Sequence, residues 1–135
     1  MNLGRDMIKA GADMVVGHGS HMLQEIEYYK GKWIIYSLGN YVFATPGRYD
    51  KLDGFPYSMA LQAEFTRDSG ELEDLKLFPF KCDNSKTDYQ ATLCTEKEMK
   101  KVKKKLTRLM DEDDGDRKRI KTKENDVGWY FDLKH

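Results

Sequence analysis

Residues 13–36, DMVVGHGSHMLQEIEYYKGKWIIY, decide the fold that this chain is expected to adopt. The first five of them form a short β-branched run that ends at glycine, which is typical of a buried strand. Residues 23–36 hold two strand-like runs on either side of Gly31, and a glycine in so short a connection favours a hairpin. The stretch therefore predicts a sheet whose first strand, residues 13–17, leads into a glycine-rich loop, residues 17–21.

The flanking sequence adds helices and antiparallel strands to that sheet. A glycine stop at position 11 ends the first predicted helix, and Pro79 favours an edge strand or a bulge where it stands. Thr95 and Glu98 have the spacing of a capping box before an amphipathic helix. The predicted elements are a helix over 2–10, strands near 58–66 and 71–80, a helix over 96–110 and a last short strand around 129–133. The expected fold class is α/β with mixed α+β character.

The composition limits the chain to one core and gives it an uneven charge. Its 135 residues hold 23 basic and 23 acidic side chains, so no net field attracts nucleic acid or an anionic membrane. Residues 1–90 carry 10 basic against 13 acidic side chains, a balance of −3, and residues 91–135 carry 13 against 10, a balance of +3. We therefore expect a packed part over 1–90 and a charged helix and tail over 91–135, with residues 111–126 mobile.

Two features bear on compartment. No apolar run approaches the ~20 residues of a membrane span, and the first residues contain no signal-peptide core, so no transmembrane segment is expected. Cys82 and Cys94 could close a short loop worth ~3 kcal/mol, but without a secretory signal two ordinary thiols are favoured. The absence of a C-x-x-C pair excludes a thioredoxin-like site.

Two histidines, His18 and His21, stand three residues apart in the loop after the first predicted strand. Loops at the carboxyl ends of strands are where α/β proteins bind ligands, and neutral imidazoles suit divalent transition metals. The alternative is a pair of polar loop histidines that hydrogen-bond to backbone carbonyls. The residues alone leave both interpretations open.

The stretch from Ala10 to Phe43 resembles the CapA family of bacterial capsule, or poly-γ-glutamate synthesis, proteins. The shared marks are GAD-x-VVGH-x-x-H, the Ile-Glu that follows, Tyr-Lys-Gly-Lys, and Tyr-Ser-Leu-Gly-Asn-aromatic-Val-Phe; the resemblance extends over roughly residues 3–80. It implies a partial calcineurin-like metallophosphatase sandwich with an added carboxy-terminal helix. It also implies that the chain corresponds to the carboxy-terminal portion of such a protein.

The resemblance also implies a site. His18 and His21 would be metal ligands for manganese, zinc or iron, His21 and Asn40 would belong to the reaction centre, and Glu27 would lie near it. Ser20 stands where family members often have proline, and Gly19 where many have a third histidine. The family's other metal-site motifs, a Gly-Asp and an Asn-His among them, do not precede this stretch. Activity as a metallophosphatase-like hydrolase therefore stays open, and we expect weak metal binding without turnover.

The predicted function is a part in capsule or poly-γ-glutamate formation, with an anionic polymer or a phosphate-containing substrate by resemblance. One alternative is an interaction module that completes a separate amino-terminal polypeptide or forms a homo-oligomer, because a strand over 13–17 without neighbours would expose its edge. The other is a nucleic-acid binder that uses the six lysines between 97 and 105. Since these lysines alternate with an apolar stripe, a solvated helix is favoured and no nucleic acid is expected. Family members are usually membrane-associated or extracytoplasmic, but the sequence contains neither anchor nor signal.

Overall fold

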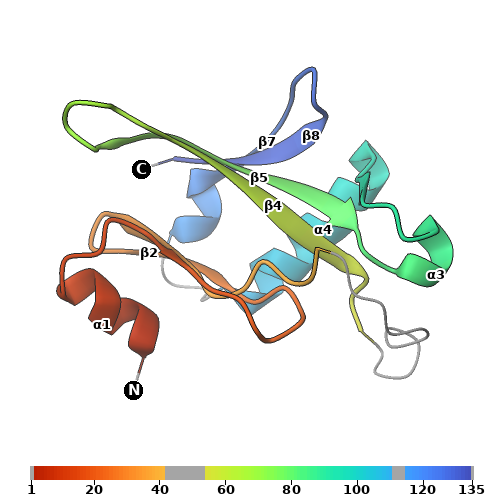
Figure 1. Ribbon diagram of the computed structural model, residues 1–135, viewed down its shortest axis with the longest axis horizontal. Coiled ribbons are helices and arrows are strands. Elements are labelled where there is room, and N and C mark those ends of the chain that lie inside the picture. The colour runs from red at the N-terminus through yellow and green to blue at the C-terminus, as the bar shows by residue number, and fades with distance from the viewer. Residues whose placement is uncertain (1, 42–53, 111–114, 135) are drawn as a thin grey trace.

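The fold is described by a computed structural model for residues 2–41, 54–110 and 115–134 (Figure 1). In chain order its elements are α1 (Leu3–Lys9), β1 (Val15–Val16), β2 (Ile26–Tyr29), β3 (Lys32–Ile35), β4 (Tyr57–Phe65), β5 (Leu72–Lys81), α3 (Asn84–Thr87), β6 (Thr92–Leu93), α4 (Glu96–Leu109), the 3-10 turn η1 (Asp116–Arg119), β7 (Ile120–Glu124) and β8 (Trp129–Leu133). The predicted α+β character is confirmed. No helix in the described ranges is long and apolar enough to cross a membrane.

The first sheet has the strand order β1-β3-β2. β2 and β3 form the predicted hairpin, which Tyr29 and Lys32 close as an opposed pair. Lys30 and Gly31 connect the strands with φ values of 51° and 80°, the left-handed backbone that a tight two-residue hairpin requires. β1 runs parallel to β3 at the end of this sheet.

The second sheet has the order β4-β5-β8-β7, and the short β6 pairs with β5. β4 and β5 are the long antiparallel strands predicted from the alternating apolar pattern, with a register shift between Glu64 and Phe65. β8, the predicted last strand, meets β5 only at Lys76 and Leu77. The sheet thus brings the end of the chain back onto its middle.

One apolar core joins both sheets to α4, which passes behind the β4–β5 hairpin in Figure 1. Its most buried members include Trp33 and Ile35 of β3, Leu75 and Leu77 of β5, Met99, Val102 and Leu106 of α4, and Phe131 of β8. Residues on both sides of position 90 therefore pack in the same core, while the predicted division at that position stays a prediction. The other face of the first sheet carries α1, against which Ile34 is buried.

The prediction that Pro79 marks an edge strand or a bulge was wrong, because β5 lies inside its sheet. Pro79 stands where the neighbour of β5 changes from β8, at residues 76–77, to β6, at residues 80–81. Its carbonyl accepts a hydrogen bond from Cys94 N at 3.0 Å. Because β5 changes its neighbour at this position, the sheet does not require a hydrogen bond from the missing N–H of the proline.

The prediction of a mobile stretch over 111–126 was wrong for residues 116–124, which form η1 and β7. β7 pairs with β8 along its whole length, although Ile120 is its one buried side chain. Residues 111–114 lie outside the described residues. The short α3 and β6 were not predicted either.

Both cysteines are buried thiols, as the sequence favoured. Cys94 belongs to the main core, and burial raises the pKa of its thiol to about 12. Cys82 receives a hydrogen bond from Ser58 Oγ at 3.2 Å. Both therefore act as small packing residues rather than as nucleophiles.

Candidate metal-binding loop

The loop after β1 is held against the end of β3 by the backbone of Gly17. Its N–H donates to Ile35 O at 2.7 Å, and its carbonyl accepts from Leu38 N at 3.3 Å. A Cβ at this position would lie 2.2 Å from Tyr36 O, so a larger residue would push β3 away. This close approach explains the glycine and fixes the point at which His18 begins the loop.

His21 and Asn40 form a reciprocal pair. His21 Nδ1 lies 2.9 Å from Asn40 Oδ1, and Asn40 Nδ2 donates to His21 O at 3.3 Å. Because the amide nitrogen faces the carbonyl, the amide oxygen faces the ring and accepts from Nδ1–H. This tautomer keeps the ring lone pair on Nε2, the arrangement found in metal-binding histidines whose other nitrogen is held by a second residue.

His21 also has an unusual backbone for a residue other than glycine, with φ at 62°. Such a conformation costs free energy and persists only where the surroundings hold it. Here the Asn40 amide holds the His21 carbonyl, and the Ser20 hydroxyl donates to the next carbonyl, Met22 O, at 2.8 Å. The loop therefore fixes the direction in which the imidazole points.

His18 lies in the wall of a pocket of about 530 Å³ between α1 and β1. The same pocket is lined by Asn2, Leu3, Gly4, Met7, Val15, Val16, Gly17 and Tyr36. The structure thus brings His21 together with Asn40 and places His18 beside α1. Both histidines are exposed, so a ligand can reach them from solvent.

The donor set fits a divalent metal in part. Imidazole nitrogens suit zinc or iron, manganese also takes oxygen donors, and a complete site takes four or more donors. In the described part of the chain, no three His, Cys, Asp or Glu side chains gather into a group that could hold an ion. The pocket that His18 lines does not include His21 or Asn40, so each histidine offers one nitrogen donor from its own place in the loop. The other donors would have to be water or come from elsewhere.

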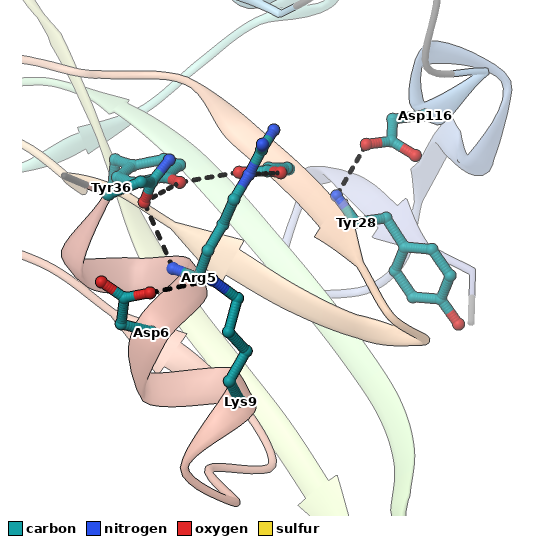
Figure 2. Close-up of polar contacts among 8 residues, drawn as sticks. Arg5, Asp6, Lys9, Tyr28, Tyr36 and Asp116 are labelled. Atoms are coloured by element: carbon teal, nitrogen blue, oxygen red, sulfur yellow. Dashed lines mark hydrogen bonds and ion pairs between the residues drawn. The ribbon is translucent and has the colours of Figure 1, made fainter.

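Glu27 bonds to Arg5 and Tyr36 in a polar cluster that joins α1 to the first sheet; Figure 2 labels Arg5 and Tyr36. Glu27 Oε1 accepts from Arg5 Nε at 2.6 Å, and its Oε2 lies 2.7 Å from the Tyr36 hydroxyl, which is also 2.8 Å from Asn2 Oδ1. Burial and the neighbouring Glu27 carboxylate raise the pKa of Tyr36 to about 12, so its hydroxyl stays protonated. Glu27 thus anchors α1, and through Asn2 and Tyr36 it shapes the pocket that His18 lines.

Sequence reasoning missed Arg5, Asn2 and Tyr36 in this cluster. A signal was available, because a glutamate on a strand between apolar residues needs a cation when it is buried. Arg5, on the predicted first helix, was the nearest candidate to cover that strand.

Residues 1–45 match the family described as the bacterial capsule synthesis protein PGA_cap. Over 41 residues the chain is 58% identical to the PGA biosynthesis protein CapA of Bacillus subtilis (strain 168) and 54% identical to the capsule biosynthesis protein CapA of Bacillus anthracis. The matched stretch is 30% of this chain, but only 11% and 10% of those two proteins. The chain therefore covers a small part of each relative. Residues 1–45, which match the family, contain His18, His21 and Asn40.

Proposed function

We propose that this chain contributes part of a divalent-metal site to capsule or poly-γ-glutamate biosynthesis, because residues 1–45 match the family of bacterial capsule synthesis proteins. The observation that supports it most is the His21–Asn40 pair, because the bond at Nδ1 orients Nε2 for a metal. His18 supplies a second imidazole from the same loop. In this proposal His21 and Asn40 belong to the reaction centre, with Asn40 acting as the positioning residue.

A bound divalent metal would act there as a Lewis acid on an oxygen of the substrate. In this proposal His18 and His21 each supply a ring nitrogen to the metal, and Asn40 fixes the orientation and the tautomer of the His21 ring. Two imidazoles leave most coordination positions to water, so they do not hold a nucleophile in one geometry. We accordingly propose that the chain alone does not hydrolyse phosphate esters.

The metal claim is tested by calorimetric titration of the parent chain with zinc and with manganese. We expect weak binding that a His18→Ala, His21→Ala double variant loses. The chain's third histidine offers a matched control, since a His135→Ala variant should bind like the parent. Asn40→Ala should weaken binding about tenfold, because residues that orient a ligand typically contribute 10- to 100-fold. Equal binding by the parent and the double variant would refute the proposal.

Turnover of a phosphomonoester and a phosphodiester, measured with added manganese, tests the second claim. We expect no turnover above that of the buffer. Hydrolysis that disappears in a His21→Ala variant would show that the chain is a complete hydrolase. Hydrolysis that the variant does not reduce would come from a contaminant and would agree with the expected lack of turnover by the chain.

A second function, an interaction module, is favoured by the surface around β1. Because Gly17 N–H points to β3, the N–H and carbonyl of Val16 point to the open side, where β1 has no neighbour among the described residues. Leu3, Met7 and Val16 are all exposed beside that edge. An open strand edge next to apolar side chains is a template for pairing with another strand. We propose that an amino-terminal polypeptide of the same family binds at this edge of β1.

Light scattering after size exclusion, with and without such a polypeptide, tests this module. The mixture should form a one-to-one complex, and a Met7→Glu, Val16→Lys variant should not join it. A Val127→Lys variant, which changes an exposed apolar residue far from β1 in the sequence, should behave like the parent. If the parent chain stays monomeric in the mixture, the interaction-module proposal is wrong. If the chain forms a homo-oligomer that excludes the polypeptide, the partner at the β1 edge is a second copy of the chain.

A further inference from the structure

The exposed face of α4 carries a continuous row of cations. Lys97, Lys101, Lys104 and Arg108 follow one another at helical spacings of four, three and four residues, and all four are exposed. They lie opposite the buried members of the helix, which include Val102 and pack in the main core. This basic stripe is about 16 Å long, because each helical residue adds about 1.5 Å.

Among the described residues, few acidic side chains neutralise the stripe. Lys100 and Lys103 flank the stripe on α4. Lys100 forms an ion pair with Glu96 at 2.9 Å. Lys103 instead reaches the Thr122 hydroxyl of β7 at 3.5 Å. For the four residues of the stripe, no acidic partner occurs in the described part of the chain.

Such an arrangement is unfavourable for a helix that needs only to be solvated. Residues four apart on a helix face one another, and like charges at that spacing destabilise it. Lys97 faces Lys101, Lys104 faces Arg108, and Lys100 faces Lys104. A solvated helix gains more from alternating signs, as α4 itself has at Glu96 and Lys100. The repulsion along the stripe would be relieved by a bound anion with several charges.

We propose that the basic stripe is a binding site for a linear polycarboxylate. Neighbouring positions along it are about 5–6 Å apart. A γ-linked glutamate polymer has one carboxylate per repeat, and its extended repeat is roughly 6 Å because its backbone has two more bonds than an α-linked residue. The choice of this polymer rests on the proposed function. The stripe lies outside residues 1–45, so it adds a contact that the family match does not cover.

The chemistry of the stripe favours a polycarboxylate over a nucleic acid. Single strands bind through stacked bases as well as charge, which requires aromatic side chains beside the cations. The exposed aromatic residues of the described chain, Tyr41, Phe65 and Tyr89, belong to other elements. Trp129, which lines a groove beside Lys103, is itself packed against the main core. Lysines, which predominate here, act as point charges rather than as the forks that recognise phosphates.

Fluorescence anisotropy with labelled poly-γ-glutamate tests the site on the full chain. We expect binding that weakens steeply between about 50 and 200 mM salt, because the contacts are ionic. A Lys97→Gln, Lys101→Gln, Lys104→Gln variant should bind about tenfold more weakly and show a shallower salt dependence. The matched control, Lys30→Gln, Arg67→Gln, Lys118→Gln, has the same net charge but leaves the stripe intact, so it should stay close to the parent.

Circular dichroism accompanies both variants, and the stripe variant should keep its helix, since it removes like-charge repulsion. Equal losses in the two triple variants would overturn the site, because net charge alone would explain them. No binding by the parent, or tighter binding of an oligothymidylate of equal charge, would overturn it as well. The His18→Ala, His21→Ala variant should still bind the polymer, so failure here and failure of the metal proposal are distinguishable.

Discussion

The two principal helices are attached to the same fold by different means. α1 adds to the buried apolar side chains of Ile8 and Ile34 a polar cluster, in which Arg5 on the helix meets the buried Glu27 on β2. α4 lies on the main core through an apolar stripe that includes Met99, Val102 and Leu106. Polar bonds have fixed directions, whereas apolar contact is proportional to area and tolerates small displacements. Each helix therefore controls the surface beside it in a different way.

The way in which each helix is attached matches the surface that it supports. Asn2 and Tyr36 belong both to the polar cluster and to the wall of the pocket that His18 lines, so the cluster sets the shape of that pocket. The buried stripe of α4 supports only the opposite, basic face, where flexible lysines need no fixed geometry. Four predictions test the comparison, in order of decreasing effect.

Leu106→Ala should have the largest effect, because α4 holds the core together. Deleting a buried leucine side chain costs about 2–5 kcal/mol, and Leu106 is 2% exposed. Urea unfolding should show a global loss of about 3 kcal/mol. Lys104→Ala, two residues earlier on the exposed face, should change the free energy of unfolding by less than about 0.5 kcal/mol. A loss no larger than that of this control would show that α4 is not part of the cooperative core.

Glu27→Gln should cost about 2 kcal/mol, since hydrogen bonds to a charged group contribute about 1.5–3 kcal/mol. The loss should be local: hydrogen exchange should accelerate in α1, while α4 keeps its protection. An exposed carboxylate on β7 provides the control, and Glu124→Gln should leave both helices unchanged. Equal acceleration in α1 and α4 would mean that the two helices unfold together and would end the distinction.

Gly4→Ala should destabilise the chain by about 1 kcal/mol, against the usual benefit of alanine in a helix. Alanine gains about 1 kcal/mol in helix propensity, but overpacking costs about 1–3 kcal/mol. The new Cβ would lie 2.9 Å from Ile34 Cγ2 and 3.1 Å from the Tyr36 ring. Thermal unfolding measures the difference, with Met7→Ala on the exposed side of α1 as the control. Stabilisation by Gly4→Ala would indicate that α1 can move away from the sheet.

The smallest effect concerns pH and the capping box of α4. Burial by itself would raise the pKa of Glu98, but hydrogen bonds from the Thr95 N–H and hydroxyl, together with Lys81, outweigh burial and hold the pKa below its usual value. The carboxylate therefore stabilises the fold above the unfolded pKa of about 4.3, and this contribution is lost as pH falls through the lower folded pKa.

Glu98→Gln should accordingly cost about 0.5–1 kcal/mol near neutral pH and flatten the acid side of the stability profile. Thermal unfolding between about pH 3 and 7 measures both changes across the pKa values concerned. Glu96→Gln is the control, because its carboxylate is exposed and, in the described ranges, pairs with Lys100 on the helix surface. An unchanged acid slope in Glu98→Gln would mean that the cap contributes nothing to folding.

Much of the candidate site could be predicted because its signals are local. Gly17, His18 and His21 stand within five residues, and the loop's place after a strand follows from the β-branched run before it. The bond between His21 and Asn40 joins residues 19 apart, and the family resemblance, not the spacing, brought Asn40 into the prediction. The apolar residues beside Glu27 indicate that it needs a cation if it is buried, but its contact with Arg5, 22 residues away, is set by the tertiary structure.

The sequence by itself determined the features that follow from neighbouring residues: the Lys30-Gly31 hairpin, the Thr95–Glu98 cap, the stripe of α4 and the glycine before the histidine loop. Backbone sterics and the periods of helices and strands are local, so they can be read from a single stretch. Only the tertiary structure decided that β7 forms, since a charged strand is stabilised by its bonds to β8. It alone also placed Pro79 inside a sheet and Arg5 against Glu27, because each of those outcomes depends on a partner distant in the sequence.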